Sequence, residues 1–209
     1  MKRSMKTAVF CAALMFLMLV EPVPDAKAAV VLGTNSGFVT VAPTVDPEGT
    51  IGTIDTYAYG FKVTAPTGAI RVTEIGWWCD TATQAANFDV GLYSHDAVND
   101  RPDQLIGSSL NNAKGTTAGW KVISGLNISI TAGTIYWIGV QLDNTATVTR
   151  TDYATDAGEK QDWLSSQTSL PSTWGVSSGT AGQLLAFYAV WEAAAASQCG
   201  KASWYKMGT

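Results

Sequence analysis

The chain has 209 residues and a formal net charge of −4 at pH 7, with 14% charged and 46% hydrophobic residues. Because this acidic balance comes without a basic cluster, it argues against binding to nucleic acid or to an anionic membrane surface, which both need Lys and Arg. A single histidine likewise excludes a histidine-rich zinc site.

The N-terminal segment has the pattern of a secretory signal peptide. A basic start is followed by an apolar run over residues 7–20 and by the small-x-small sequence Ala26-Lys27-Ala28. The alternative is a transmembrane anchor, but the run is shorter than the roughly 20 residues that span a bilayer. We therefore expect cleavage after residues 1–28 and secretion of a mature chain that keeps nine basic and 15 acidic residues.

Short segments in which apolar and polar residues alternate recur along the rest of the chain. In residues 135–142, Tyr136, Ile138 and Val140 fall on one face and Trp137 falls on the other. Alternation with a period of two is typical of half-buried antiparallel strands. In chain order we expect strands over residues 38–42, 57–63, 70–79, 88–92, 105–110, 120–130, 135–142, 147–153 and 184–191.

Several such strands in series predict an all-β fold, an antiparallel β-sandwich of jelly-roll type with about eight to ten strands. The stretch 120–130 holds one strand or two, with a break near Gly125. Residues 154–182 lack clear periodicity and are expected to form a long loop. A mature chain of this size is one domain. We place the β-sandwich at residues 29–192 and a poorly patterned tail, which either docks on the domain or is a flexible end, at residues 193–209.

The stretch from Leu92 to Val140, with the glycine before it, carries a series of recognisable motifs. They are G-L-Y, then L-I-G-S-S, then G-W, and finally T-A-G-T-I-Y-W. Together they resemble jelly-roll modules of bacterial secreted and cell-surface proteins and of some phage virion proteins, and the likeness covers residues 70–191. The resemblance implies the jelly-roll fold. Some of these modules look like carbohydrate-binding modules, while many have no assigned function, and no catalytic residue is carried over.

Motifs for nucleophilic catalysis are absent from the sequence. A Ser-His-Asp triad would need His95 as its base, yet this residue lies in a polar loop, and the chain has no G-x-S-x-G sequence. No glycine-rich phosphate loop precedes a helix. A carboxylate pair for glycoside hydrolysis stays open, because its spacing is set in three dimensions. We expect a protein that is not an enzyme.

The loop from Ser94 to Gln104 is rich in side chains that carry oxygen, and calcium takes about six to eight oxygen ligands. The candidate ligands are Asp96, Asn99, Asp100 and Asp103. Their spacing matches no EF-hand, and Arg101 would oppose a nearby cation. Because Asp and Asn are also ordinary turn residues, we expect a turn here, with calcium as the alternative and as the one candidate cofactor.

Two cysteines, Cys79 and Cys199, remain after the expected cleavage. An even number in an exported chain favours a disulfide. Closing so long a loop would contribute on the order of 4–5 kcal/mol in the chain-entropy model. The alternative is two separate thiols, with Cys79 filling the core on the same side of its strand as Trp77.

Eight tryptophans are many for this length, and they supply candidates for a carbohydrate site. Most should be core residues, as should Tyr136, since aromatic side chains dominate core energetics. Three rings share their strand faces with polar residues and could form an outward platform for sugar rings, with Gln141 binding hydroxyls. These rings are Trp78, Tyr93 and Trp137. The alternative is that the long loop or the tail covers this face.

A second candidate site lies in the expected long loop. Trp163 and Trp174 fall within it, and Tyr153 lies just before its start. Together these rings could bind sugar at an edge of the sandwich.

These features lead to two hypotheses of function. The favoured one is a secreted, non-catalytic β-sandwich module that binds a surface ligand, with a polysaccharide or cell-surface glycan as the expected partner. The alternative is a structural subunit of an extracellular filament, matrix or virion that assembles with copies of itself. It rests on the apolar segment Ala29–Gly33, which can pair within its own sheet or add as a strand to a neighbour's sheet. Neither hypothesis involves nucleic acid or a membrane span in the mature chain.

Overall fold

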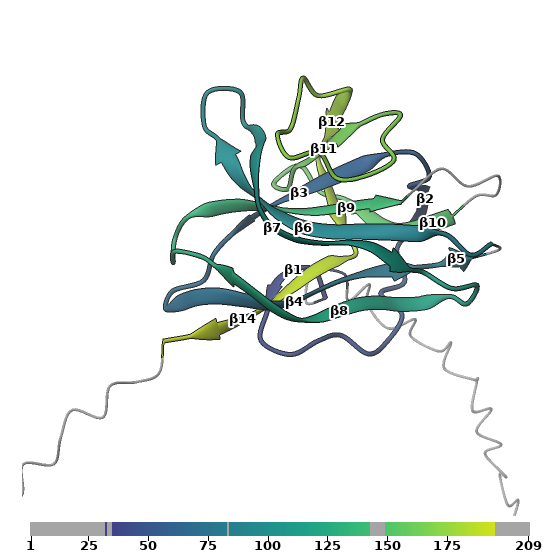
Figure 1. Ribbon diagram of the computed structural model, residues 1–209, viewed down its shortest axis with the longest axis horizontal. Coiled ribbons are helices and arrows are strands. Elements are labelled where there is room, and N and C mark those ends of the chain that lie inside the picture. The colour runs from purple at the N-terminus through teal and green to yellow at the C-terminus, as the bar shows by residue number, and fades with distance from the viewer. Residues whose placement is uncertain (1–31, 33–34, 83, 143–148, 195–209) are drawn as a thin grey trace, which may run out of the picture.

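The computed structural model describes residues 32, 35–82, 84–142 and 149–194. The expected signal peptide and almost all of the expected tail lie outside these residues. Within them nearly all of the regular secondary structure is β-strand, as the alternation predicts (Figure 1). No helix in this part of the chain is long and apolar enough to cross a membrane.

Fourteen strands run through the described residues, and eight of them have seven or more residues. The long strands are β3 (Ala58–Thr64), β4 (Ala69–Cys79), β6 (Asn87–Asp96), β7 (Arg101–Ala113), β8 (Gly119–Ser129), β9 (Ile135–Leu142), β10 (Thr149–Thr155) and β14 (Phe187–Ala193). The short strands are β1 (Gly37–Val39), β2 (Thr50–Thr53), β5 (Thr81–Ala82), β11 (Gln161–Leu164), β12 (Gly179–Ala181) and β13 (Gln183–Leu185). The expectation of about eight to ten strands therefore fits the long strands and misses most of the short ones.

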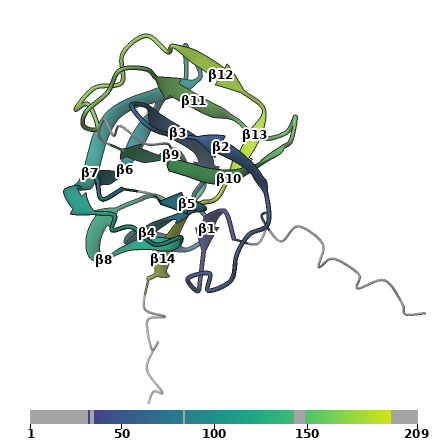
Figure 2. The same cartoon turned by 90° about the vertical axis from the view of Figure 1, so that its right-hand side faces the viewer.

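The strands form two facing layers and a small side sheet (Figure 1, Figure 2). One layer is a six-stranded sheet in the order β12-β11-β3-β9-β6-β7, and the other is a four-stranded sheet in the order β1-β14-β4-β8. The side sheet has the order β13-β10-β2, and β5 also pairs with β10. Among these pairings only that of β1 with β14 is parallel. The expected all-β sandwich is confirmed, while the jelly-roll connectivity stays a prediction.

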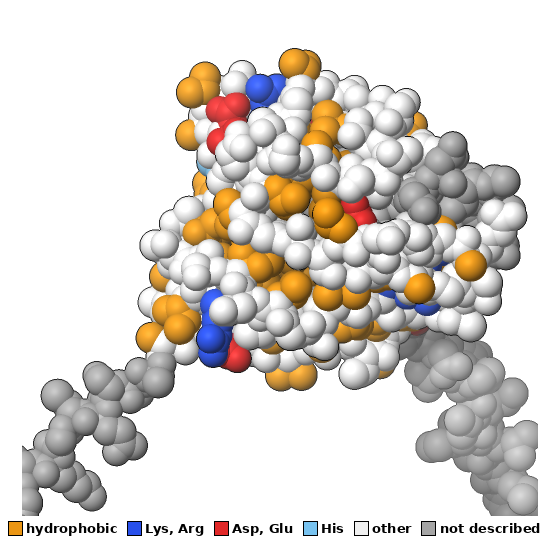
Figure 3. All heavy atoms as spheres, in the orientation of Figure 1, with side chains coloured by type: hydrophobic (Ala, Val, Ile, Leu, Met, Phe, Trp, Pro, Cys, Tyr) orange, Lys and Arg blue, Asp and Glu red, His pale blue; other side chains and the backbone are white. Residues whose placement is uncertain are grey.

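The core lies between the two layers and follows the alternation in the sequence. β9 contributes Tyr136 and Ile138 from its inner face, and β4 of the opposite layer contributes the fully buried Trp77. Trp77 meets Phe88 of β6 edge-on, with ring centroids 5.7 Å apart. Trp77 and Tyr136 are thus core residues, as predicted. Burying each large apolar side chain stabilises the fold by about 1.5–3 kcal/mol. The face shown in Figure 3 carries few charged side chains, in keeping with the low charge content of the sequence.

Three segments differ from their expected bounds for identifiable reasons. β6 and β7 extend to a hairpin between Asp96 and Arg101, because main-chain pairing continues after the apolar alternation ends. The break expected near Gly125 is an irregularity within one continuous β8, where this glycine has a positive φ of 76°. Residues 154–182, expected as a loop, contain β11 and β12. β11 shows no alternation, and it pairs with β3, far earlier in the chain.

The first described residue packs into this domain. Leu32 is buried against Trp78 and Ala186, on the side of β4 that faces away from the core. β1 follows it and pairs with the last strand, β14. The other residues of the segment 29–33 lie outside the described residues, so addition of this segment to a neighbour's sheet stays a prediction.

Candidate functional site

The expected aromatic platform on the six-stranded sheet is covered. Tyr93 of β6 and Trp137 of β9 do lie side by side on its outer face. Both side chains are fully buried, because residues 165–178, termed the covering segment, bring Leu170 and Trp174 onto them. Trp78 is also buried, on the other layer. The prediction that Trp78, Tyr93 and Trp137 form an exposed platform is therefore wrong, and the alternative of coverage by the long loop holds for Tyr93 and Trp137.

Two buried carboxylates hold the covering segment in place. Asp89 accepts a hydrogen bond from the backbone amide of Leu170 at 2.9 Å, and Asp162 accepts one from Trp174 Nε1 at 2.8 Å. Burial raises the pKa of Asp162, although its hydrogen bonds oppose that shift. A buried carboxylate is destabilising unless it is hydrogen-bonded. These contacts therefore make Trp174 a structural anchor.

Two side chains that were predicted to bind a ligand, Gln141 and Tyr93, also form hydrogen bonds to the covering segment. Gln141 Nε2 donates a hydrogen bond to the carbonyl of Gln167 at 2.8 Å, and the Tyr93 hydroxyl donates one to the carbonyl of Pro171 at 2.7 Å. Gln141 is 1% exposed. Both side chains thus bind the covering segment and present no surface to a ligand.

The predicted calcium ligands Asp96, Asn99, Asp100 and Asp103 lie in and beside the hairpin that joins β6 to β7. Asp96 caps the turn by accepting hydrogen bonds from backbone amides, and Asp100 pairs with Lys62 at 2.5 Å and Lys160 at 2.8 Å. The described residues contain no group of three or more acidic, histidine or cysteine side chains that could hold a metal ion. The geometry is that of the expected turn, in which lysines and backbone amides bind the carboxylates, and calcium binding by these residues stays a prediction.

The predicted disulfide involves one described residue. Cys79 is fully buried at the end of β4, and its thiol lies 3.6 Å from the carbonyl of Thr81. It belongs to the core cluster, as the alternative interpretation predicts. Cys199 lies outside the described residues, so its pairing with Cys79 stays a prediction.

Three partly exposed aromatic rings lie in a row beside the side sheet, and we call them the aromatic rim: Tyr57, Tyr59 and Trp163. Tyr59 and Trp163 are opposite each other in the β3–β11 pair. The ring centroids are 5.7 Å apart between the two tyrosines and 6.2 Å apart between Tyr59 and Trp163. The Trp163 ring lies against Gly179 of β12, where an added Cβ would be only 2.1 Å from the ring. The pairing of three strands therefore fixes the position of the rim.

The rim contains one of the two loop tryptophans and excludes the other. On β11, Asp162 and Leu164 point outward to the covering segment, so Trp163 between them points to the opposite face. Trp174 is 2% exposed beneath that segment. The prediction of a site made by Trp163 and Trp174 together is wrong for this reason, whereas Trp163 by itself is accessible.

A cavity of about 200 Å³ adjoins the rim, between the side sheet and the six-stranded sheet. Its lining combines the rings of Tyr59 and Tyr153 with the amides of Gln161 and Gln183. The Tyr59 hydroxyl donates a hydrogen bond to a backbone carbonyl of β2 at 3.3 Å. Burial raises the pKa of Tyr59 to about 12, so this phenol stays neutral at physiological pH. The cavity is therefore polar but uncharged.

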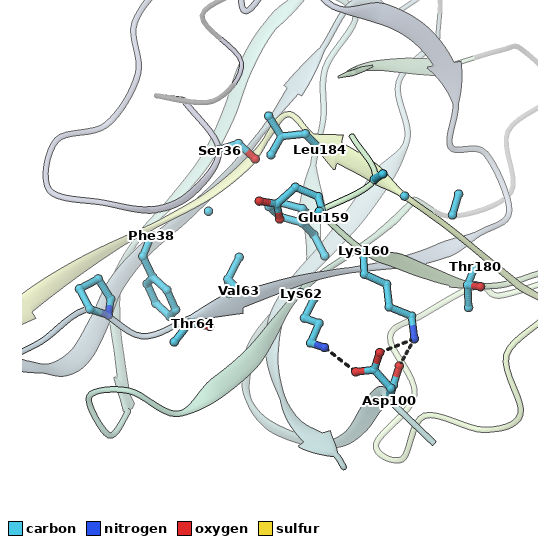
Figure 4. A pocket seen from close by; sticks show the side chains of 17 residues that line it. Ser36, Phe38, Lys62, Val63, Thr64, Asp100, Glu159, Lys160, Thr180 and Leu184 are labelled. Carbon is cyan, nitrogen blue, oxygen red and sulfur yellow. Dashed lines mark hydrogen bonds and ion pairs between the residues drawn. The ribbon is translucent and has the colours of Figure 1, made fainter. Parts of the chain in front are cut away.

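A larger groove of about 880 Å³ opens between β1 and β3 (Figure 4). Lys62 and Lys160 both reach Asp100 on one side of it. Burial alone would raise the pKa of Asp100, but the two lysines outweigh it and lower the pKa to about 2. Glu159 points away from this cluster toward Phe38, and among the described residues its carboxylate has no hydrogen bond or ion pair. The groove thus presents four charged side chains and one partly exposed ring, Phe38.

Sequence reasoning found one residue of the rim and missed the others. The alternation places Tyr59 with Phe61 on the core face of β3, which is correct, but Tyr59 lies near the start of the strand, where it is only partly covered. Gln161 and Gln183 carry no local signal, because they meet only through the contact between β11 and β13. Comparisons of the chain with protein-family models, with curated proteins and with solved structures found no match.

Proposed function

We propose that this protein is a secreted, non-catalytic β-sandwich module that binds carbohydrate at the aromatic rim. The observation that carries the proposal is the row of three partly exposed rings beside a cavity lined by two amide side chains. Export belongs to the proposal and rests on the sequence of residues 1–28.

The chemistry of the rim and the cavity suits a neutral glycan. A sugar ring has apolar C–H faces, which aromatic rings can cover, and tyrosine and tryptophan provide large, rigid contact areas at little entropic cost. Its hydroxyls both donate and accept hydrogen bonds, as do the amides of Gln161 and Gln183. None of the described residues that form the rim or line the cavity is charged.

The same residues favour binding over hydrolysis. A glycosidase places two carboxyl groups on either side of the bond that it cleaves. Asp162 is adjacent to Trp163 in sequence, but it points to the other face of β11 and binds Trp174. The described lining of the cavity contains no carboxylate at all. Bound sugar would therefore meet hydrogen-bonding groups without a general acid.

The structural-subunit hypothesis has less support. It needs the segment 29–33 to add to a neighbouring copy. The one described residue of that segment, Leu32, is 1% exposed and fills a site between Trp78 and Ala186 of its own domain. A filament assembled through this segment would have to withdraw Leu32 from that site.

A glycan array tests the proposal. It is probed with the protein that is expressed from the full sequence and purified from the culture medium. We expect binding to a defined set of glycans by the unmodified protein and loss of that binding in Trp163→Ala. The matched control is Phe38→Ala, which removes the partly exposed ring of the larger groove instead. A melting curve for each variant confirms that it is folded.

Three results would count against the proposal in different ways. Loss of binding in Phe38→Ala with retention in Trp163→Ala would move the ligand to the groove between β1 and β3. No binding to any glycan by the folded, unmodified protein would overturn carbohydrate binding itself. Retention of residues 1–28 in the purified protein, seen by mass spectrometry, would contradict cleavage of a signal peptide.

A further inference from the structure

The cavity beside the rim points to the part of the glycan that is recognised. Resting on the proposed function, we infer that the cavity receives the terminal residue of a glycan chain, while the rim stacks on the residues that follow it. The protein would then bind chain ends rather than the middle of a polysaccharide.

The size and position of the cavity carry the first step. Its volume of about 200 Å³ is below the roughly 300–1,000 Å³ of pockets that bury drug-sized ligands, which suits a single sugar ring. Ile54 and Leu185 line it, and each is 3% exposed, so the core bounds it on their side. Because the core closes that side, a chain that enters from the rim meets a wall, which favours a chain end over the middle of a chain.

A buried acceptor without a partner carries the second step. Gln161 lines the cavity and is 5% exposed. Its Nε2 donates a hydrogen bond to Gln183 Oε1, while its own Oε1 has no partner among the described residues. Leaving a buried acceptor unpaired is destabilising, and nearly all such groups in proteins are satisfied. This oxygen has almost no accessible surface, so a hydroxyl of an entering sugar residue, which is a donor, would satisfy it after a rotation of the Gln161 side chain.

The walls beside this acceptor are shaped for a ring. Tyr59 belongs both to the cavity and to the rim, so it connects the two sites. Gly52 lies against the ring of Tyr153, which also lines the cavity, and an added Cβ there would be 3.1 Å from the ring. Aromatic rings and amide groups that line one cavity are suited to cover the faces of a sugar ring and to bind its edge.

Two kinds of probe separate the cavity from the rim. One is a set of methyl glycosides of glucose, galactose, mannose and N-acetylglucosamine, measured by saturation-transfer NMR on the full chain. The other is the linear hexasaccharides maltohexaose, cellohexaose and chitohexaose, measured by calorimetry. We expect at least one methyl glycoside to bind and its matching hexasaccharide to bind more tightly.

The variants assign each effect to its site. Gln161→Leu removes the acceptor and should weaken binding of both probes by about tenfold, the loss expected for one buried hydrogen bond. Trp163→Ala should weaken the hexasaccharide more than the methyl glycoside. Gln104→Leu, an exposed glutamine on β7, is the control and should change neither.

The outcomes distinguish this inference from the proposed function. If a hexasaccharide binds while no methyl glycoside does, or if Gln161→Leu leaves both affinities unchanged, the cavity holds only water and the terminal-residue inference is overturned, although binding at the rim stands. If neither these probes nor any glycan on the array binds, the proposed function itself fails and the inference fails with it.

Discussion

Two tyrosine–tryptophan pairs on the six-stranded sheet have the same residue types but differ in solvent exposure. Tyr93 and Trp137 lie opposite each other on β6 and β9, and Tyr59 and Trp163 lie opposite each other on β3 and β11. The first pair is fully buried, and the second is partly exposed. The covering segment, residues 165–178, accounts for the burial of the first pair. Exposure of a ring in this fold therefore depends on a distant segment as much as on the strand that carries it.

The largest expected difference between the pairs is in stability. Trp137→Ala should lower the free energy of unfolding by about 3–5 kcal/mol, because it empties a fully buried site and removes the hydrogen bond from Trp137 Nε1 to His95 Nδ1 at 3.1 Å. Trp163→Ala should lower it by less than about 2 kcal/mol, because a partly exposed ring loses less burial. Urea denaturation of both variants measures the difference. Equal losses would mean that the rim is part of the core.

The next effect concerns what keeps the first pair covered. Asp89→Ala should lower the free energy of unfolding by about 1–3 kcal/mol, because it leaves the buried amide of Leu170 without an acceptor. Hydrogen exchange within residues 165–178 should increase, while glycan binding at the rim should persist. Asp103→Ala is the control, since among the described residues that side chain accepts a hydrogen bond only from its neighbour Gln104. Unchanged exchange in Asp89→Ala would show that apolar packing alone holds the segment.

A smaller effect on stability but a clear one on binding is expected at the second pair. Gly179→Ala places a Cβ 2.1 Å from the present position of the Trp163 ring, so the ring has to move away from Gly179 and change its position relative to Tyr59. Glycan affinity should fall by several-fold, with a stability change below about 1 kcal/mol. Gly175→Ala is the matched control, because a Cβ there meets nothing within 4 Å. Equal affinity of the two variants would contradict a role for the position of Trp163.

The contrast between the pairs also shows where sequence reasoning succeeds. The alternation in residues 135–142 correctly assigns Tyr136 and Ile138 to the core and Trp137 to the opposite face, because strand periodicity is a local property. Whether that opposite face is exposed depends on a hydrogen bond from Leu170 to Asp89, which joins residues 81 positions apart. The alternation of apolar and polar residues along a strand does not indicate such a contact. Trp163 can be predicted as a candidate from its residue type alone. The cavity at Gln161 cannot be predicted in this way, because it is formed by contacts between residues far apart in the sequence.

The region around the covered pair also leads to a prediction about pH. Lys62 and Lys160 place their ammonium groups 6.0 and 5.9 Å from the centroid of the Trp137 ring, and both bind Asp100. Asp100 thereby holds two cations at the edge of the covered face. The rim consists of two tyrosines and a tryptophan and carries no carboxylate, so acid should affect the two regions differently.

The smallest expected effect follows from the titration of Asp100. The lysines outweigh burial and lower the pKa of Asp100 to about 2 in the folded protein, whereas an unfolded Asp has a pKa near about 3.9. The folded state therefore gains stability from this carboxylate above about pH 4 and loses it as the pH falls toward about 2. The side chain is 45% exposed, so the gain should be below about 1 kcal/mol. Urea midpoints of the unmodified protein and Asp100→Asn should thus differ at pH 6 and converge near pH 2, with Asp103→Asn as control. If the difference between the midpoints of the two proteins stayed constant across this range, the charge of Asp100 would not stabilise the folded state.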